Sequence, residues 1–181
     1  WRFEERWSST QTGRACPSTH ATPFNLMHRQ QFWEPVCEHF PEMAPFIRLM
    51  YGQPSLQIFQ GPKDQPMSVL SSEGAKQGEQ CGTTLYALGL QPILVEVQRV
   101  ALPNGHILAF ADDTCIVGPA EEVADAYLLF ERLYMERTFG ELRRDKSKVY
   151  APNISVDNLR AAGLPADIPS SAESCNVLGI D

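Results

Sequence analysis

Residues 106–117 read His-Ile-Leu-Ala-Phe-Ala-Asp-Asp-Thr-Cys-Ile-Val, which is two short apolar runs on either side of an acidic pair. The dipeptide Asn104-Gly105 precedes this stretch and favours a tight reversal of the chain. The pattern predicts a two-stranded hairpin that carries Asp112 and Asp113 at its tip. Adjacent aspartates at a turn are most often structural, because Asp bonds to nearby backbone and tolerates tight bends. At the end of a rigid hairpin, however, such a pair can also hold divalent metal ions.

On both sides of the hairpin, helical and extended patterns alternate irregularly. Apolar spacing, prolines and glycines predict helices over residues 25–40, 41–51, 83–97 and 119–140, and strands over residues 56–60, 67–70, 149–150 and 176–180. Residues 1–17 have no clear period and are expected to be an irregular N-terminal remnant, and residues 152–174 are rich in Pro, Gly and Ser. This mixture predicts an α+β fold, with an antiparallel sheet and helices packed on one face.

Composition narrows the class of protein. The 181 residues, 43% of them hydrophobic, suffice for one core, and no run approaches the roughly 20 apolar residues of a membrane span. The five cysteines include no CxxC pair, which favours reduced thiols and an intracellular location, in the cytoplasm or the nucleus. A net charge of -7 suits a free-standing nucleic-acid binder poorly, so any such role must be local or must depend on further parts.

Several segments occur in the order of a known family. Residues 110–113 (Phe-Ala-Asp-Asp) resemble the aromatic-Ala-Asp-Asp signature of reverse transcriptases, the RNA-directed DNA polymerases, here of the non-LTR retrotransposon type. The other matching segments are Pro23-Phe24-Asn25 with Arg29, residues 39–42, residues 49–52, residues 71–79, Lys146 and residues 177–180. The resemblance implies a partial palm domain over residues 18–181. It also implies that the fingers are incomplete and the thumb is absent. We expect the missing fingers and thumb segments to belong to a longer polyprotein.

The resemblance also implies roles for particular residues. Asp112 and Asp113 would be catalytic and would bind Mg²⁺ or Mn²⁺, with Lys146 as a further catalytic residue. The substrate-binding residues would be Phe24, which excludes a 2'-hydroxyl, Gln77, which bonds the nucleotide, and Gly78, which allows close backbone approach. The reaction would be two-metal nucleotidyl transfer from a dNTP to a DNA primer on an RNA template.

Four positions depart from the family pattern. Glu79 and Gln80 replace the usual Asp-Pro of the second motif, which is a mild change, and the other two are more severe. Thr19 stands where the first motif has its metal-binding aspartate, and a hydroxyl is a poor Mg²⁺ ligand. Pro23 replaces an alanine and would remove a backbone donor from an expected central strand. We therefore expect metal binding to be weakened or lost and the chain to be catalytically defective.

Two other interpretations stay open. The chain could be a non-catalytic nucleic-acid-binding or interaction domain that retains the palm fold. It could also be a metal hydrolase that uses Asp112, Asp113 and a further ligand, for which His106 is the nearest candidate in the sequence. For the palm, the sequence predicts that Thr19 lies on a strand beside the hairpin. It also predicts that residues 71–82 form a loop entering a helix, with Gln77 facing the hairpin across a cleft.

Overall fold

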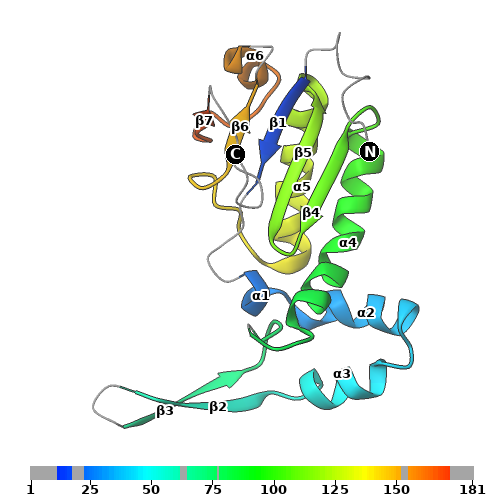
Figure 1. The fold of residues 1–181 in the computed structure, drawn as a ribbon, viewed down its shortest axis with the longest axis vertical. Coiled ribbons are helices and arrows are strands. Elements are labelled where there is room, and N and C mark those ends of the chain that lie inside the picture. Colours follow the sequence, from blue (N-terminus) through cyan, green and yellow to red (C-terminus); the bar gives the residue numbers. More distant parts are fainter. Residues whose placement is uncertain (1–11, 18–22, 62–64, 77, 152–154, 172–181) are drawn as a thin grey trace.

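The computed structural model describes residues 12–17, 23–61, 65–76, 78–151 and 155–171. A sheet backed by two long helices forms one part of the molecule, and two shorter helices with a projecting ribbon form the other (Figure 1). The helices are α1 (Pro23–Leu26), α2 (Arg29–His39), α3 (Ala44–Tyr51), α4 (Gly82–Ala101), α5 (Ala120–Thr138) and α6 (Val156–Ala161). The strands are β1 (Thr12–Cys16), β2 (Ser55–Gln60), β3 (Pro66–Ser71), β4 (His106–Phe110), β5 (Asp113–Pro119), β6 (Lys148–Tyr150) and β7 (Ser170–Ser171).

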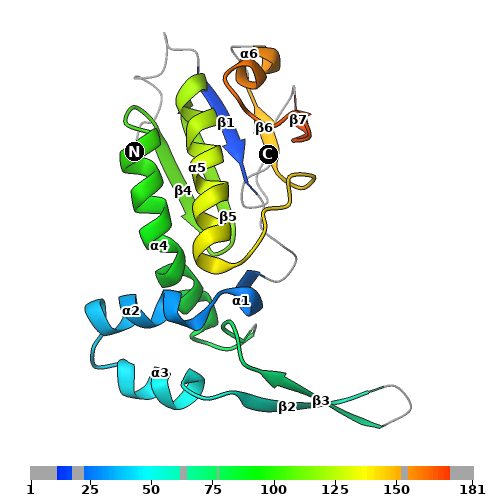
Figure 2. The same ribbon diagram turned by 180° about the vertical axis from the view of Figure 1, so that it is seen from behind.

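The larger sheet has the strand order β4-β5-β1-β6-β7 and is antiparallel except for the pair β6 and β7. Helices α4 and α5 lie on the same face of it, which Figure 2 shows from behind. Ala15, Ile116 and Val149 are neighbours in register on β1, β5 and β6, and all three are buried. The predicted α+β architecture, an antiparallel sheet with helices on one face, is confirmed.

Both long helices carry the signals that the sequence led us to expect. Helix α5 follows Pro119, has Glu121 and Glu122 in its first turn, where acids favour the helix dipole, and ends at Phe139 in the left-handed conformation. Its inner face is fully buried and aromatic. The largest buried side chains of the two helices are Tyr86, Leu85, Leu90 and Ile93 on α4 and Tyr127, Phe130 and Tyr134 on α5.

The second part of the molecule lies beyond one end of the sheet (Figures 1 and 2). Strands β2 and β3 pair from Ser55 with Ser71 to Gln60 with Pro66, and the resulting ribbon points away from the body. Apolar side chains are exposed on both of its faces, with Ile58 and Leu70 on one face and Phe59 and Val69 on the other. The predicted strands at residues 56–60 and 67–70 are confirmed.

The N-terminal part of the sheet differs from the prediction. Within residues 1–17, which we expected to be irregular, residues 12–16 form β1, the strand between β5 and β6. The alternating pattern was hard to see because the strand has only five residues. Pro23 does not interrupt a central strand, since it is the first residue of α1, where a missing N–H costs nothing.

Other boundaries also shift. The predicted helix over residues 25–40 is divided into α1 and α2, and α3 begins at Ala44 rather than at Pro41. Helix α6 and strand β7 occupy part of the stretch that we expected to be a loop. The predicted strand over residues 176–180 lies outside the described residues. No helix in the described part of the chain is long and apolar enough to span a membrane.

Candidate functional site

The hairpin of β4 and β5 ends in a tight turn at the acidic pair. Phe110 pairs with Asp113, so the two turn residues are Ala111 and Asp112, and Asp113 already belongs to β5. Ala111 adopts a φ of 55°, which is strained for a residue with a side chain and matches the primed turns of tight hairpins. Both aspartates are exposed. The turn therefore presents two unshielded carboxylates at the end of a rigid ribbon.

A buried tyrosine pair lies between the helices behind this hairpin. The hydroxyls of Tyr86 on α4 and Tyr134 on α5 are 3.3 Å apart and hydrogen-bonded. Burial is the main cause that raises the pKa of Tyr134, and the negative charge of Asp112 raises it further. The ring of Phe24 packs on Tyr86 with 4.7 Å between centroids. Contacts thus run from Phe24 through Tyr86 to Tyr134, and α1 lies near the hairpin end of the sheet (Figures 1 and 2).

The glycine-containing loop after β3 is fastened to α1. The N–H of Gly74 donates to Met27 O at 2.9 Å, and the N–H of Ala75 donates to Phe24 O at 2.7 Å. Gly74 has a φ of 63°, and a Cβ there would lie 2.3 Å from the backbone of Asn25. The close backbone approach that Gly74 permits is therefore an approach to the backbone of α1, not to a ligand.

Gly78 differs from Gly74. Its φ is 86°, and a Cβ there would have no atom within 4 Å. The residue is exposed and comes just before the turn into α4, so the predicted loop entering a helix is present. Open space beside Gly78 is compatible with the predicted approach of a ligand. Gln77 lies outside the described residues, and its predicted orientation is untested.

Arg29 holds the loop to the rest of the second part. Its guanidinium donates to Tyr51 O at 2.9 Å, to Ser71 O at 3.1 Å and to Gly74 O at 3.2 Å. Weaker bonds reach Gln53 O and Glu73 O. A single side chain on α2 thereby ties together the end of α3, the end of β3 and the loop. The planar guanidinium suits this role because its donors point in several fixed directions.

Tyr51 provides a second connection to the same loop. Its hydroxyl donates to the carboxylate of Glu79 and accepts from the N–H of Lys76 at 3.3 Å. Burial first, and then the bond with Glu79, raise the pKa of Tyr51 above its usual value. The guanidinium carbon of Arg29 lies 5.3 Å from the centre of the Tyr51 ring, within the range of cation–π attraction. Glu79 thus serves as an anchor for the loop.

The remaining predicted site residues are Lys146 and Thr19. Lys146 is exposed in the turn between α5 and β6, where its N–H bonds to Arg143 O and its charge helps to lower the pKa of Asp145, a shift that is caused mainly by Arg143. No contact with the hairpin is present among the described residues. Thr19 lies outside the described residues, and its predicted place beside the hairpin is untested.

The acidic turn was also tested as a metal site. Within the described residues, no group of three or more His, Cys, Asp or Glu side chains is placed to hold a metal ion. His106 is at the opposite end of β4 from the turn, which is roughly 17 Å along a strand. It is therefore too far to complete a hydrolase site. Two carboxylates alone do not complete the ligand set of a two-metal centre.

Known proteins resemble this chain in structure but not in sequence. No protein-family model matches the chain, and no curated protein matches it. Solved structures of telomerase match it, and the chain shares its fold with a part of them.

The two telomerase structures match similar shares of this chain. Telomerase from Candida albicans, solved in complex with a TWJ fragment of telomeric RNA, matches with a TM-score of 0.61 and 8% identity over 77% of this chain. Apo telomerase from Candida tropicalis, truncated from its C-terminal domain, matches with a TM-score of 0.63 and 9% identity over 83% of this chain. This chain covers 28% and 32% of those two chains, so the polymerase-like domain spans less than a third of each.

Sequence reasoning missed part of what builds this polymerase-like site. It noted Arg29 only as part of a motif and read Glu79 only as a departure from the family's aspartate. Their partner Tyr51 lies 22 residues from Arg29 and 28 from Glu79, and nothing in the sequence joins these positions. The pairing of Tyr86 with Tyr134 spans 48 residues and likewise had no local signal.

Proposed function

We propose that this chain is the palm of a reverse transcriptase of the non-LTR retrotransposon type and that it does not catalyse DNA synthesis as it stands. In the family the palm carries out RNA-templated transfer of a nucleotide from a dNTP to a DNA primer. The observation that carries the proposal is the pair Asp112 and Asp113 at the turn of the β4–β5 hairpin, in a fold that is similar to part of telomerase.

The retrotransposon origin is supported by the order of the sequence motifs. Residues 23–29, 39–42, 49–52 and 71–79 precede the hairpin in the order that is typical of non-LTR elements. In this reading the fingers and thumb belong to other segments of a polyprotein. Those segments would supply most of the contacts to template and primer.

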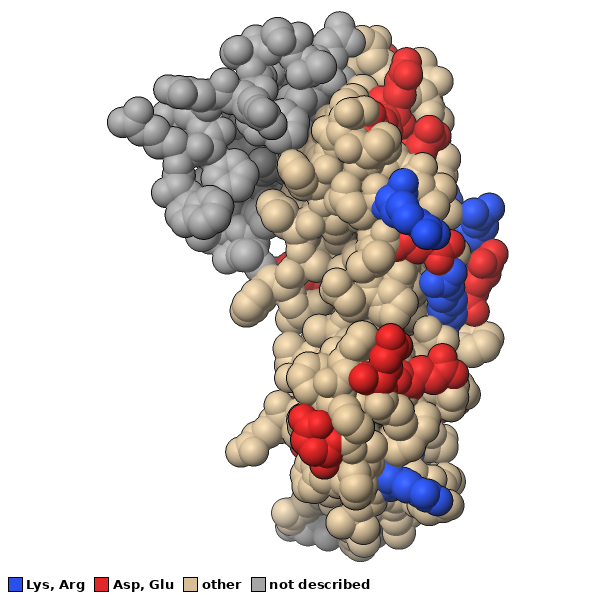
Figure 3. Space-filling model, turned by 90° about the vertical axis from the view of Figure 1, so that its right-hand side faces the viewer, with Lys and Arg blue, Asp and Glu red and all other residues tan. Residues whose placement is uncertain are grey.

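The charge distribution fits a palm that depends on further parts. On the face drawn in Figure 3, acidic and basic side chains are interspersed, and no continuous basic track crosses it. Four arginines of the described residues, Arg137, Arg143, Arg144 and Arg160, are paired with carboxylates of the same chain. Such paired cations have little charge left to attract phosphates.

A second candidate is a non-catalytic domain that keeps the palm fold to bind nucleic acid or another protein. The uncharged Thr19 at the position of the first-motif aspartate favours it over an active enzyme. The two candidates differ in whether the acidic turn was once a metal site.

The test restores the missing carboxylate. Calorimetry with Mg²⁺ and Mn²⁺ on Thr19→Asp should show affinity at least about 10-fold tighter than for the unchanged chain, because a third carboxylate completes the hairpin site. Thr22→Asp adds the same charge three residues away and should have no such effect. Adding Asp112→Asn to Thr19→Asp should remove the gain. Equal binding by Thr19→Asp and Thr22→Asp would refute the placement of Thr19 and, with it, the palm assignment of the site.

A further inference from the structure

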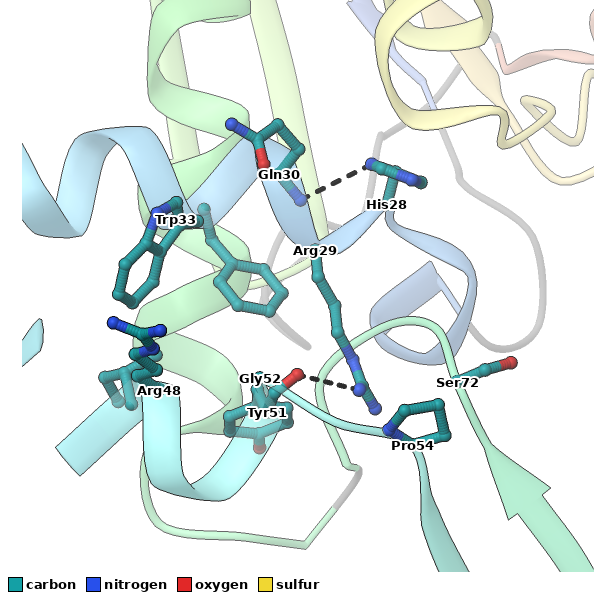
Figure 4. A pocket seen from close by; sticks show the side chains of 11 residues that line it. His28, Arg29, Gln30, Trp33, Arg48, Tyr51, Gly52, Pro54 and Ser72 are labelled. Atoms are coloured by element: carbon teal, nitrogen blue, oxygen red, sulfur yellow. Dashed lines mark hydrogen bonds between the residues drawn. The ribbon is translucent and has the colours of Figure 1, made fainter. Parts of the chain in front are cut away.

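A cavity of about 520 Å³ lies between α2, α3 and the loop that follows β3, away from the acidic turn. Figure 4 shows its lining side chains, with Trp33 and Arg48 near one another at one end and Arg29 with Ser72 at the other. The volume falls in the range of small-molecule sites. No part of the proposed catalytic function uses this cavity.

Its aromatic wall is already rigid. Phe32 is buried and packs edge-on against Tyr51, with 5.7 Å between ring centroids. Trp33, the next residue on α2, is half-buried and keeps part of its indole exposed toward the cavity. A partly exposed indole offers a flat surface on which a planar ring can stack, and its side chain has only two rotatable bonds to order.

The charge of the lining is one-sided. Two arginines and no carboxylate contribute to the cavity. The guanidinium of Arg29 donates to the neutral carbonyl groups of Tyr51 and Ser71 and is in no salt bridge with a residue that the structure describes. Arg48 makes no ion pair with any residue that the structure describes, in contrast to Arg137 and Arg144. In a chain with a net charge of -7, this cavity therefore concentrates positive charge that nothing in its lining compensates.

These features together select a ligand class. The indole favours a planar ring, and the guanidinium of Arg48 favours phosphate, to which arginine donates with matching geometry. We propose that this cavity binds a nucleoside phosphate, with the base against Trp33 and the phosphate at Arg48. The same chemistry occurs in a free nucleotide and in one nucleotide of a strand.

The test follows tryptophan fluorescence while the chain is titrated with AMP, inorganic phosphate, adenosine or a ten-residue oligoadenylate. AMP should quench the signal, whereas phosphate and adenosine should each bind at least about 10-fold more weakly, because each offers half of the recognised groups. The Trp33→Phe variant should lose the response. This control shows that the quenched fluorescence comes from Trp33 and not from Trp1 or Trp7. Quenching by AMP supports a free nucleotide, and quenching by the oligonucleotide alone supports a nucleotide within a strand.

Two matched arginine variants test whether AMP binds in this cavity. Arg48→Gln should weaken binding about 10-fold, whereas Arg99→Gln, an equally exposed arginine on α4 outside this cavity, should not change it. Both positions are on the surface, so both variants should fold, which circular dichroism checks. Asp112→Asn should bind like the unchanged chain, so that the result is independent of the proposed polymerase site. Equal affinity of Arg48→Gln and Arg99→Gln, or phosphate binding as tight as AMP, would overturn the proposal.

Discussion

At the scale of single residues, two positions hold the loop after β3 in place, and they do so by different means. Arg29 donates hydrogen bonds to carbonyl groups on three segments. Gly74 has no side chain, which lets the loop backbone pack directly against the backbone of Asn25. The loop leads through Gly78 and Glu79 into α4. Its position therefore determines where these residues could contact a ligand bound near the hairpin.

Replacement of Arg29 by lysine should destabilise the chain by about 2–4 kcal/mol. An ammonium cannot reach Tyr51 O, Ser71 O and Gly74 O at the same time, and bonds to a charged donor are worth roughly 1.5–3 kcal/mol each. Urea unfolding measures the loss, and hydrogen exchange should become faster over residues 71–76. Arg99→Lys, on the exposed side of α4, should stay within about 0.5 kcal/mol. An equal, small effect of both substitutions would mean that Arg29 does not anchor the loop.

The two glycines of this loop should respond unequally to alanine. At either position alanine would have to adopt a positive φ, which costs roughly 1–2 kcal/mol. At Gly74 the new Cβ would also meet the backbone of Asn25 at 2.3 Å, which forces α1 and the loop apart. We expect Gly74→Ala to lower the free energy of unfolding by at least about 2 kcal/mol more than Gly78→Ala does. The comparison uses the same urea assay, and equal losses would contradict the close contact.

At the scale of helices and strands, the elements with strong local signals were predictable from the sequence. The hairpin of β4 and β5, the ribbon of β2 and β3 and the helix α5 were found because turn residues, alternation and capping residues agree there. Strand β1 was missed because its place between β5 and β6 comes from long-range pairing.

For the candidate site, the sequence located the acidic turn and the glycine loop but not the side chains that pack between α1 and the two long helices. Phe24 contacts Tyr86 on α4, and Tyr86 is hydrogen-bonded to Tyr134 on α5. Tertiary packing alone brings such residues together, so no periodicity of the chain could reveal them. The same holds for Arg29, whose acceptors lie on other elements.

Helix α5 makes the stability of the fold sensitive to alkaline pH. Burial, the largest cause, raises the pKa of Tyr127 from 10.0 to about 12, although its bond to Ser147 acts in the opposite direction. Because the pKa is higher in the folded state, the stabilisation is complete below pH 10 and is lost as the pH rises from about 10 to about 12. Urea unfolding across this range should show a loss of roughly 2–3 kcal/mol from this residue. Tyr127→Phe should show a correspondingly smaller decline, and identical pH profiles would exclude the effect.

At the scale of the whole molecule, the chain combines a polymerase-like fold with an acidic overall charge and a projecting apolar ribbon. Leu56, Ile58 and Leu70 are each more than half exposed, and an isolated two-stranded ribbon is marginally stable in water. An exposed apolar surface of this kind is typical of a region that packs against another protein. The proposed activity accordingly depends on more than the acidic turn.

The unchanged chain should show no detectable primer extension with template, primer, dNTP and Mg²⁺ or Mn²⁺. Two-metal catalysis requires a group of carboxylates around the ions, and Thr19, at the position of the first-motif aspartate, contributes no charge. If poor metal placement removes even about 4 kcal/mol of transition-state stabilisation, the rate falls roughly a thousandfold, which takes it below detection. Thr19→Asp should restore metal binding more readily than turnover, because alignment of primer and template needs fingers and thumb as well. Robust extension by the unchanged chain that Asp112→Asn abolishes would show that another residue supplies the missing carboxylate and that Thr19 is not its position.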